Sequence, residues 1–435
     1  MSPELQIVSV FVLFVGLLGA GMAVPFAIML PAMLYLFLQG GLAAFNGLGL
    51  VSWGSMDSYT LTSIPLFILM AEIIQQSGLG YRVYGGLSKL VSRIPGGLLQ
   101  TNIAGCAMFS AISGSSIATA AAIGKVALPQ LMSRGYDRPL SAGSLAAGGT
   151  LGILIPPSIA MIVYGTFTET SVAKLFMAGV VPGLVLTVMF MIYIAIHATL
   201  KPSIAPKEPG TLSRAQKFRA LLDMVPFVVL MVVVLGTIYT GIATPTEAAG
   251  VGCLISLVIC RIWGDLGWRE FVEALKVSTI VVGNILFITY AAFVFSYAMS
   301  FGGVGEHVTE FIIGLKLNKF EFMIALFILF TALGALVESL GMIVITVPLL
   351  FPVLAKYGID PIWFGIIVVI YIELGQITPP IGINLFVIQS IWKGGTLSEV
   401  VMGTIPFHLV MFLLLLLMMV WPELALWLPN RMSAK

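Results

Sequence analysis

Long apolar runs, separated by short stretches that are polar or rich in glycine and proline, dominate the hydrophobic pattern of this chain. A bilayer core of about 30 Å requires about 20 apolar residues in a spanning helix, and runs of that length recur throughout the sequence. Apolar length and breaker residues predict spanning helices in the first half at 5–20, 24–40, 60–78, 141–165 and 172–200. In the second half they are predicted at 225–241, 247–263, 277–301, 362–391 and 402–428.

Two further apolar segments are interrupted near their middle by small and polar residues. They cover 94–133 and 320–355, and the interruptions are Ser113–Ser116 and Glu338–Gly341. Each arm is too short to cross a bilayer comfortably, so each segment is predicted to be a re-entrant helical hairpin with its tip at membrane depth.

The second half of the chain repeats the pattern of the first. A shift of 223 residues brings Ser116 onto Ser339, Asp137 onto Asp360, Gly152 onto Gly375 and Pro156 onto Pro379. Five crossings per copy is an odd number, so the second copy must enter the membrane from the opposite side. The predicted fold is an all-α polytopic membrane protein with inverted repeats at 1–200 and 224–435, joined by a linker at 201–223. The helices at 141–165 and 362–391 are expected to be broken.

Charge and composition agree with a membrane protein. Hydrophobic residues make up 59% of the chain and charged residues 9%, far from the roughly 25% charged residues of soluble domains. Of the 21 Lys and Arg residues, 14 lie in loops assigned to the cytoplasm, 6 on the other side and one in the first hairpin. The positive-inside rule therefore places the linker inside and both termini outside. The first apolar run lacks the basic start of a signal peptide and is expected to remain as a span.

The sequence argues against enzymatic and nucleic-acid-binding functions. A net charge of +2 without a basic stripe does not favour nucleic acid. The three cysteines stand singly in apolar runs, which does not favour a metal site or a disulfide. The three histidines lie far apart in the sequence and are expected at interfaces and not in a catalytic site. No phosphate-binding loop occurs, because Thr119 stands where the leading glycine of the nearest candidate, Gly124-Lys125, belongs.

The double prolines at 156–157 and 379–380 mark breaks where carbonyl oxygens lose their helical donors. Freed carbonyls and nearby hydroxyls suit a small hard cation, while half-helix N-termini attract an anion such as a carboxylate. The first sodium site is predicted to comprise Ser113, Ser115, Ser116, Gly149, Thr150, Ile155 and Pro156. The second is predicted to comprise Glu338, Ser339, Gly341, Gln376, Thr378 and Pro379. The candidate substrate-binding residues are Ser116, Ser158, Ser339 and Asn384.

Several of these features have a plainer structural interpretation. The prolines could simply kink helices, although two matched kinks beside polar hairpin tips favour a site. Glu338 could compensate a cation, carry a proton or cap a half-helix. Glu72, Glu247 and Glu373 are expected at interfaces or paired with a cation such as Lys125. The amphipathic segments 41–58 and 263–276 are expected to lie in the membrane interface.

The same motifs resemble those of a known family. The runs 114–125 and 149–158, with Pro129 and Gly135-Tyr136, look like the large membrane subunit of tripartite ATP-independent periplasmic (TRAP) transporters. Glu338–Gly341 and Thr378–Gly382 extend the resemblance over essentially the whole chain.

The resemblance implies a sodium-driven, elevator-type carrier in the bacterial inner membrane. It implies two partners, a periplasmic binding protein that delivers an organic acid and a small membrane subunit, which is expected to be a separate chain. Family substrates include C4-dicarboxylates and sialic acid. The alternatives are a stand-alone sodium- or proton-coupled carboxylate symporter, a channel and a membrane-embedded enzyme.

Overall fold

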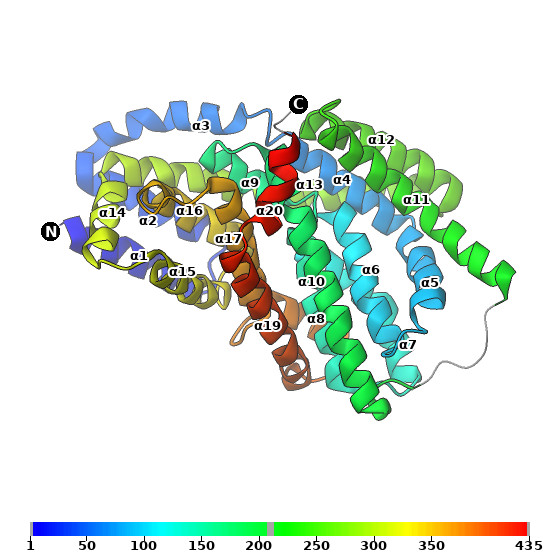
Figure 1. Cartoon of the computed structure of the whole chain (residues 1–435). Helices are drawn as coiled ribbons and strands as arrows, with labels where there is room; N and C mark the ends of the chain where they lie inside the picture. The colour runs from blue at the N-terminus through cyan, green and yellow to red at the C-terminus, as the bar shows by residue number, and fades with distance from the viewer. Residues whose placement is uncertain (1–2, 207–212, 433–435) are drawn as a thin grey trace.

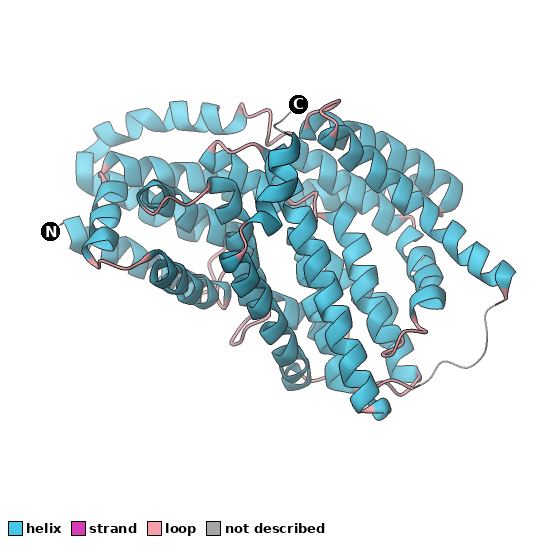
Figure 2. Cartoon of the chain, viewed as in Figure 1, coloured by secondary structure: helices cyan, strands magenta, loops and turns pink. Residues whose placement is uncertain are grey.

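The computed structural model describes residues 3–206 and 213–432, and within these ranges the ordered elements are all helices (Figures 1 and 2). In the first half a short 3-10 helix, η1 (Gly41–Gly47), follows the second α-helix, and another, η2 (Pro202–Ile204), follows the last. The α-helices of this half are α1 (Pro3–Gly19), α2 (Val24–Gly40), α3 (Leu48–Met56), α4 (Ser63–Gln76), α5 (Leu79–Val91), α6 (Leu98–Ser113), α7 (Ser116–Ser133), α8 (Arg138–Leu154), α9 (Ile159–Thr168) and α10 (Val172–Leu200).

The second half has a similar succession of elements, although one long helix takes the place of η1, α3 and α4 and a short helix is added at the end. Its helices are α11 (Arg214–Tyr239), α12 (Pro245–Trp263), α13 (Trp268–Phe301), α14 (Val304–Gly314), α15 (Lys319–Gly334), α16 (Ser339–Lys356), α17 (Pro361–Gln376), α18 (Ile383–Ile391), α19 (Leu397–Val420) and α20 (Glu423–Met432). The helix pairs α6–α7 and α15–α16 occupy the segments that the sequence marks as hairpins. The pairs α8–α9 and α17–α18 are each divided at a double proline.

Matched capping residues begin the two broken helices. Asp137 accepts a hydrogen bond from the Leu140 amide at 2.9 Å, and Asp360 accepts one from the Ile362 amide at 2.8 Å. A proline follows in the first turn of each helix, where its missing N–H costs nothing. Both helices therefore start in the same way. In each half the double proline begins 18 residues after the first residue of the helix.

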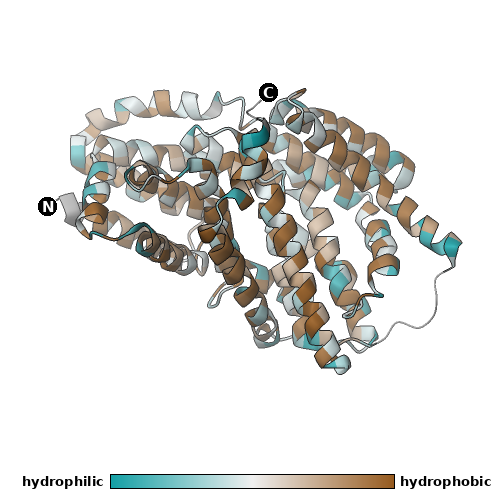
Figure 3. Cartoon of the chain, viewed as in Figure 1, coloured by the Kyte–Doolittle hydropathy of each residue, from teal (hydrophilic) through white to brown (hydrophobic). Residues whose placement is uncertain are grey.

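Eight helices among the described residues are long and apolar enough to cross a membrane, and four shorter helices are also apolar. Figure 3 shows hydrophobic residues along most of the helices, including their outward faces. Leu254 on α12, for example, is 65% exposed. Apolar side chains on the outside are the arrangement expected of helices that face lipid, and the all-α, multi-span prediction is confirmed.

Several predicted boundaries differ from those of the structure, and the predicted linker at 201–223, for example, includes the first ten residues of α11. The amphipathic segment 263–276 and the helix 277–301 form one helix, α13, because no proline or glycine interrupts the chain between Trp268 and Val282. The segment 41–58 forms η1 and α3. The helix predicted at 402–428 ends at Val420 and restarts at Glu423, because Pro422 has no N–H with which to continue it.

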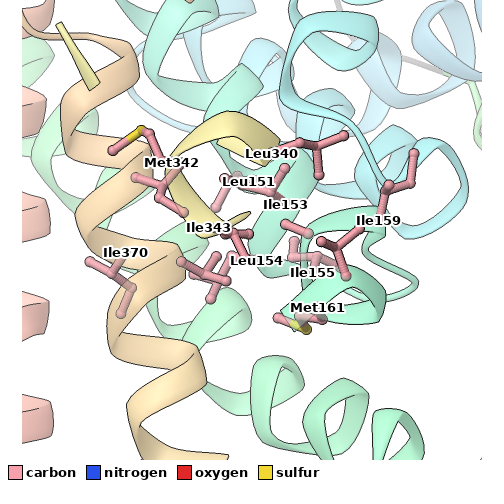
Figure 4. Packing of buried hydrophobic residues seen from close by; sticks show 14 of the residues in the cluster. Leu151, Ile153, Leu154, Ile155, Ile159, Met161, Leu340, Met342, Ile343 and Ile370 are labelled. Carbon is pink, nitrogen blue, oxygen red and sulfur yellow. The ribbon is translucent and has the colours of Figure 1, made fainter. Parts of the chain in front are cut away.

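The two halves pack together through their broken helices and through α19. Gly143 of α8 lies against the backbone of Gly403 in α19, where an added Cβ would meet the Gly403 carbonyl at 2.1 Å. Tyr164 of α9 donates a hydrogen bond to the Pro361 carbonyl at 2.7 Å. Figure 4 shows apolar side chains of α8, α9, α16 and α17 in one packed cluster, among them Leu151, Ile153, Leu154, Ile155, Ile159, Met161, Leu340, Met342, Ile343 and Ile370.

Candidate substrate and ion site

The first hairpin turns within two residues. Gly114 has a φ of 61°, which favours glycine, and ends α6, while Ser115 caps α7 by accepting a hydrogen bond from the Ala118 amide. The Ser113 and Thr119 hydroxyls lie 2.7 Å apart across this turn, and both residues are buried. The tip thus gathers two hydroxyl groups and the start of a half-helix in one buried place.

This tip rests directly on the break between α8 and α9. The Ile159 amide donates a hydrogen bond to the Gly114 carbonyl at 3.3 Å. A Cβ at Gly152 would lie 2.4 Å from the Ser115 carbonyl oxygen and 2.8 Å from Thr119 Oγ1. Only glycine at position 152 therefore allows the Ser115 carbonyl and the Thr119 hydroxyl to approach the broken helix so closely.

The double proline frees carbonyl groups at this contact. In an uninterrupted helix, Pro156 and Pro157 would be the donors to Gly152 and Ile153, but neither has an N–H. The Ile153 carbonyl accepts a hydrogen bond from Ser158 Oγ at 2.6 Å instead, and Ser158 also caps α9. The Gly152 carbonyl belongs to the same turn that touches the hairpin tip, so it is available to a cation there.

The other residues predicted for the first site have varied environments. Gly149 packs against Ala120 of α7, and the Thr150 hydroxyl donates to the carbonyl of Ala147 in its own helix at 2.7 Å. Ile155 lies against Gly183 of α10. Ser116 is the first, buried residue of α7. Pro156 precedes Pro157 across a cis peptide bond, as Pro379 precedes Pro380 in the second half.

The second break brings together backbone carbonyls and a histidine. Gly382, with a φ of 53°, begins α18, and a Cβ there would lie 2.8 Å from the Thr378 carbonyl oxygen and 3.2 Å from that of Gln376. The helical donor to Gln376 would have been Pro380, which has no N–H. The Thr378 hydroxyl donates to the Leu374 carbonyl at 2.6 Å and lies 3.1 Å from Nε2 of His408 in α19.

Three fully buried polar side chains around this break have atoms that lack hydrogen-bond partners among the described residues. Both carboxylate oxygens of Glu373, both amide atoms of Gln376 and the Oδ1 atom of Asn384 make no hydrogen bond. Asn384 Nδ2 donates to the Ala146 carbonyl of α8 at 3.3 Å, which joins the two halves. Buried polar groups without partners cost about 1–3 kcal/mol each, and a bound ion or substrate would supply those partners.

The second hairpin contacts the second broken helix next to the C-terminal end of α17. Gly334 of α15 and Gly375 of α17 lie backbone to backbone, since a Cβ on Gly334 would be 2.6 Å from the Gly375 Cα. Glu338 precedes α16 at the N-cap position, but its side chain makes no capping hydrogen bond and Oε1 is buried without a partner. The structure therefore does not show the Glu338 side chain capping the half-helix.

Two predicted residues of the second site lie at the start of α16. Ser339 is its first, buried residue, and Gly341 faces Val337 and Val24 of α2. Within the described part of the chain, no hydrogen bond joins this start to the second break. The two halves thus differ, because the first tip is bonded to its break and the second reaches its broken helix through the Gly334–Gly375 contact.

Sequence reasoning missed three residues of these sites. Thr119 follows the tip by one helical turn. Because residues four apart lie on the same face of a helix, its spacing from Ser115 could have predicted that its hydroxyl belongs to the tip. His408, expected at an interface, touches Thr378. Glu373, expected at an interface or paired with a cation, is buried without such a partner. It occupies the place that Thr150 takes in the first half, 223 residues earlier.

Glu247, expected at an interface or paired with a cation, and Lys125, the suggested cation, have simple environments. Glu247 accepts a hydrogen bond from the Thr244 amide at 2.8 Å and closes a capping box at the start of α12. Lys125 is exposed. Neither residue lies at the helix breaks.

Two matched helix breaks, buried within a helical body that spans a membrane and each served by a hairpin, define the class of secondary transporters. Such breaks let backbone groups meet a small solute at membrane depth, and the described residues contain no cluster of three or more His, Cys, Asp or Glu side chains able to hold a catalytic metal. This arrangement is that of a transporter.

Comparison with known proteins identifies the family. Residues 10–424 match the tripartite ATP-independent periplasmic transporter, DctM component, and the chain belongs to this family. A C4-dicarboxylate TRAP transporter large permease protein of Pseudomonas aeruginosa is 36% identical over 378 residues, which cover 86% of this chain and 87% of that protein. The family resemblance drawn from the sequence is confirmed.

More distant relatives carry other substrate names. The sialic acid TRAP transporter large permease protein of Vibrio cholerae is 28% identical, with 96% of this chain and 97% of that protein covered. An isethionate TRAP transporter permease protein of Oleidesulfovibrio alaskensis is 34% identical and covers 84% of this chain, which spans 58% of that protein. The crystal structure of the Alcanivorax borkumensis YdaH transporter shares the fold, with a TM-score of 0.62, 17% identity and 90% of each chain covered.

Proposed function

We propose that this chain is the large permease of a sodium-coupled TRAP transporter that imports an organic acid across the bacterial inner membrane. A periplasmic binding protein delivers the acid, and a small membrane subunit completes the complex. The names of the relatives support an anionic substrate such as a C4-dicarboxylate or sialic acid. The two helix breaks support the sodium coupling.

The observation that carries the proposal is the contact between the first hairpin tip and the first break. The Ser115 carbonyl and the Ser113 and Thr119 hydroxyls face a turn whose Gly152 carbonyl has lost its helical donor. Neutral oxygen atoms at close quarters are suited to a monovalent hard cation, because they replace its water without a competing fixed charge. Sodium is the coupling ion that fits this set.

The second break supports a second cation and the substrate. The Gln376 and Thr378 carbonyls converge at Gly382, and the buried carboxyl group of Glu373, whose oxygen atoms have no partner, lies about one turn before Gln376 on α17. Asn384 stands at the beginning of α18, where amide groups and the helix dipole favour an anion. A carboxylate that binds between Asn384 and Ser158 would gain favourable interactions at the N-termini of both half-helices.

An elevator movement is supported by the way the helices pack. The broken helix of the first half contacts α19 through Gly143–Gly403 and α17 through Tyr164–Pro361, so these helices form a single body around the site. Helices α1, α2, α11 and α12 lie outside that body. If these packed helices moved as one unit, they would carry ion and substrate together, and the contacts at the helix breaks would stay intact.

The decisive experiment is uptake of labelled organic acids into proteoliposomes that contain this chain and its small subunit. The inward sodium gradient and the binding protein are each supplied or omitted. We expect uptake only when both are present, and the acid taken up names the substrate. Uptake without the binding protein would replace this proposal with a stand-alone symporter, and uptake driven equally by a proton gradient would remove sodium from it.

A further inference from the structure

Two adjoining cavities lie away from the helix breaks, between the N-terminal helices and the second hairpin. The first, of about 280 Å³, is lined by residues of α1, α2, α13, α14, α15 and α16. The second, of about 650 Å³, lies beside it along α13, α14 and α16. Met299 and Leu349 line both cavities, so the two spaces share a wall.

The smaller cavity is apolar. Phe14, Phe295, Val308 and Leu333 are typical of its lining, and its one hydroxyl, that of Thr346, donates to the Met342 carbonyl at 2.7 Å. Water needs two to four polar partners to occupy a buried space, and this lining provides none that is free. Hydrocarbon is therefore the natural occupant of this cavity in a protein surrounded by lipid.

The larger cavity is polar and carries charge of both signs. Its lining includes Glu306 and Glu310, which are four residues apart on α14, and Lys356 in the last turn of α16. The three charged side chains are exposed at this mouth. Leu349, Pro352 and Lys356 follow one another along α16 at intervals of about one turn, so the lining changes from apolar to charged toward the helix end.

An apolar cavity that opens beside two carboxylates and one ammonium group matches the chemistry of one ligand class. We propose that this pair of cavities binds a phospholipid with a phosphoethanolamine headgroup. One acyl chain fills the smaller cavity, the lipid phosphate pairs with Lys356, and the lipid's primary ammonium pairs with Glu306 and Glu310.

The charges select this headgroup over two common alternatives. A phosphatidylglycerol headgroup is anionic and brings no cation to the two carboxylates, which would repel its phosphate. A phosphatidylcholine headgroup carries a cation but no N–H, so it donates no charge-assisted hydrogen bond to Glu306 or Glu310. The primary ammonium of phosphatidylethanolamine satisfies both requirements.

The position of the site gives the lipid a mechanical role. Its acyl chain touches α1 and α2 on one side and both helices of the second hairpin, α15 and α16, on the other. A lipid held there fills the space between the hairpin and the N-terminal helices. The occupied cavity thus links the hairpin to the N-terminal helices, whatever solute the breaks carry.

The test is native mass spectrometry of the purified full chain after delipidation. The chain is incubated with phosphatidylethanolamine, phosphatidylglycerol or phosphatidylcholine of identical acyl chains. We expect one phosphatidylethanolamine to be retained at least tenfold more than either other lipid. Leu349→Trp, which fills the shared wall, should abolish retention, whereas Leu254→Trp on the lipid-facing side of α12 should leave it unchanged.

A second variant keeps the test independent of packing. The double change Glu306→Gln and Glu310→Gln alters only exposed side chains, and it should remove the preference for phosphatidylethanolamine over phosphatidylcholine. Equal retention of the three lipids by the unaltered chain would overturn the proposal. Full retention by Leu349→Trp would overturn it too. Because lipid binding is read directly, neither result depends on whether sodium drives uptake.

Discussion

Replacement of Gly152 by alanine tests the contact on which the first ion site depends. The new Cβ would lie 2.4 Å from the Ser115 carbonyl oxygen and 2.6 Å from the Ser115 carbonyl carbon. These are backbone atoms, so no side-chain rotation can relieve the clash. Either the hairpin tip or α8 must move by several tenths of an ångström, and the tip is held by the Ile159–Gly114 hydrogen bond.

The size of the effect follows from the cost of overpacking. An extra methyl group in a well-packed interior costs about 1–3 kcal/mol. If that cost is borne by the ion-bound arrangement, sodium affinity falls by about 5- to 150-fold, since about 1.4 kcal/mol corresponds to tenfold. The half-saturating sodium concentration for uptake into proteoliposomes should rise accordingly.

The matched control for this change is Gly236→Ala in α11. A Cβ at Gly236 meets no atom within 4 Å, so this variant should keep the sodium dependence of the unaltered protein. Thermal unfolding of both variants shows how much of the cost falls on the fold instead of the ion. Our reasoning is refuted if Gly152→Ala unfolds at the usual temperature and takes up substrate with an unchanged sodium dependence.

Three further predictions concern the second break. Glu373→Gln replaces a fully buried carboxyl group, whose two oxygen atoms have no partner, by an amide of similar size, so the unfolding temperature should not fall while sodium-driven uptake falls at least tenfold; undiminished uptake would make Glu373 purely structural. Asn384→Ala removes the 3.3 Å bond to Ala146 and should raise the KM for substrate with the sodium dependence retained; a changed sodium dependence alone would contradict the anion-binding role. His408→Phe removes the contact with the Thr378 hydroxyl and should weaken sodium activation about fivefold, for a loss of about 1 kcal/mol; equal activation would place His408 outside the ion site.

Local sequence patterns were enough to predict the class of fold. Apolar runs of helical length require a bilayer, and the double prolines at 156–157 and 379–380 divide α8 from α9 and α17 from α18 where the prediction placed the breaks. Where the chain has no breaker, as between Trp268 and Val282, the prediction separated a helix that is continuous. The length of an apolar run and the position of a helix-breaking residue are local properties. Predictions based on them therefore depend only on neighbouring residues in the sequence.

The internal repeat could also be recognised in the sequence, but it suggested that the two helix breaks have more similar surroundings than the structure shows. Gly152 and Gly375 correspond in sequence, yet one faces a hairpin tip and the other faces the backbone of Gly334. Thr150 uses its hydroxyl within its own helix, whereas Glu373 at the corresponding position is buried without a partner. Matching positions in a repeat share a backbone path, but their neighbours come from other elements.

By itself, the amino-acid sequence determined that the chain is a helical membrane protein with two breaks, because hydrophobicity, helix length and the missing N–H groups of proline act within a few turns. Only the tertiary structure decided which oxygen atoms meet at those breaks. The approach of Ser115 to Gly152, of His408 to Thr378 and of Asn384 to Ala146 joins residues 30 or more positions apart. Such contacts depend on the packing of whole helices, which no local pattern specifies.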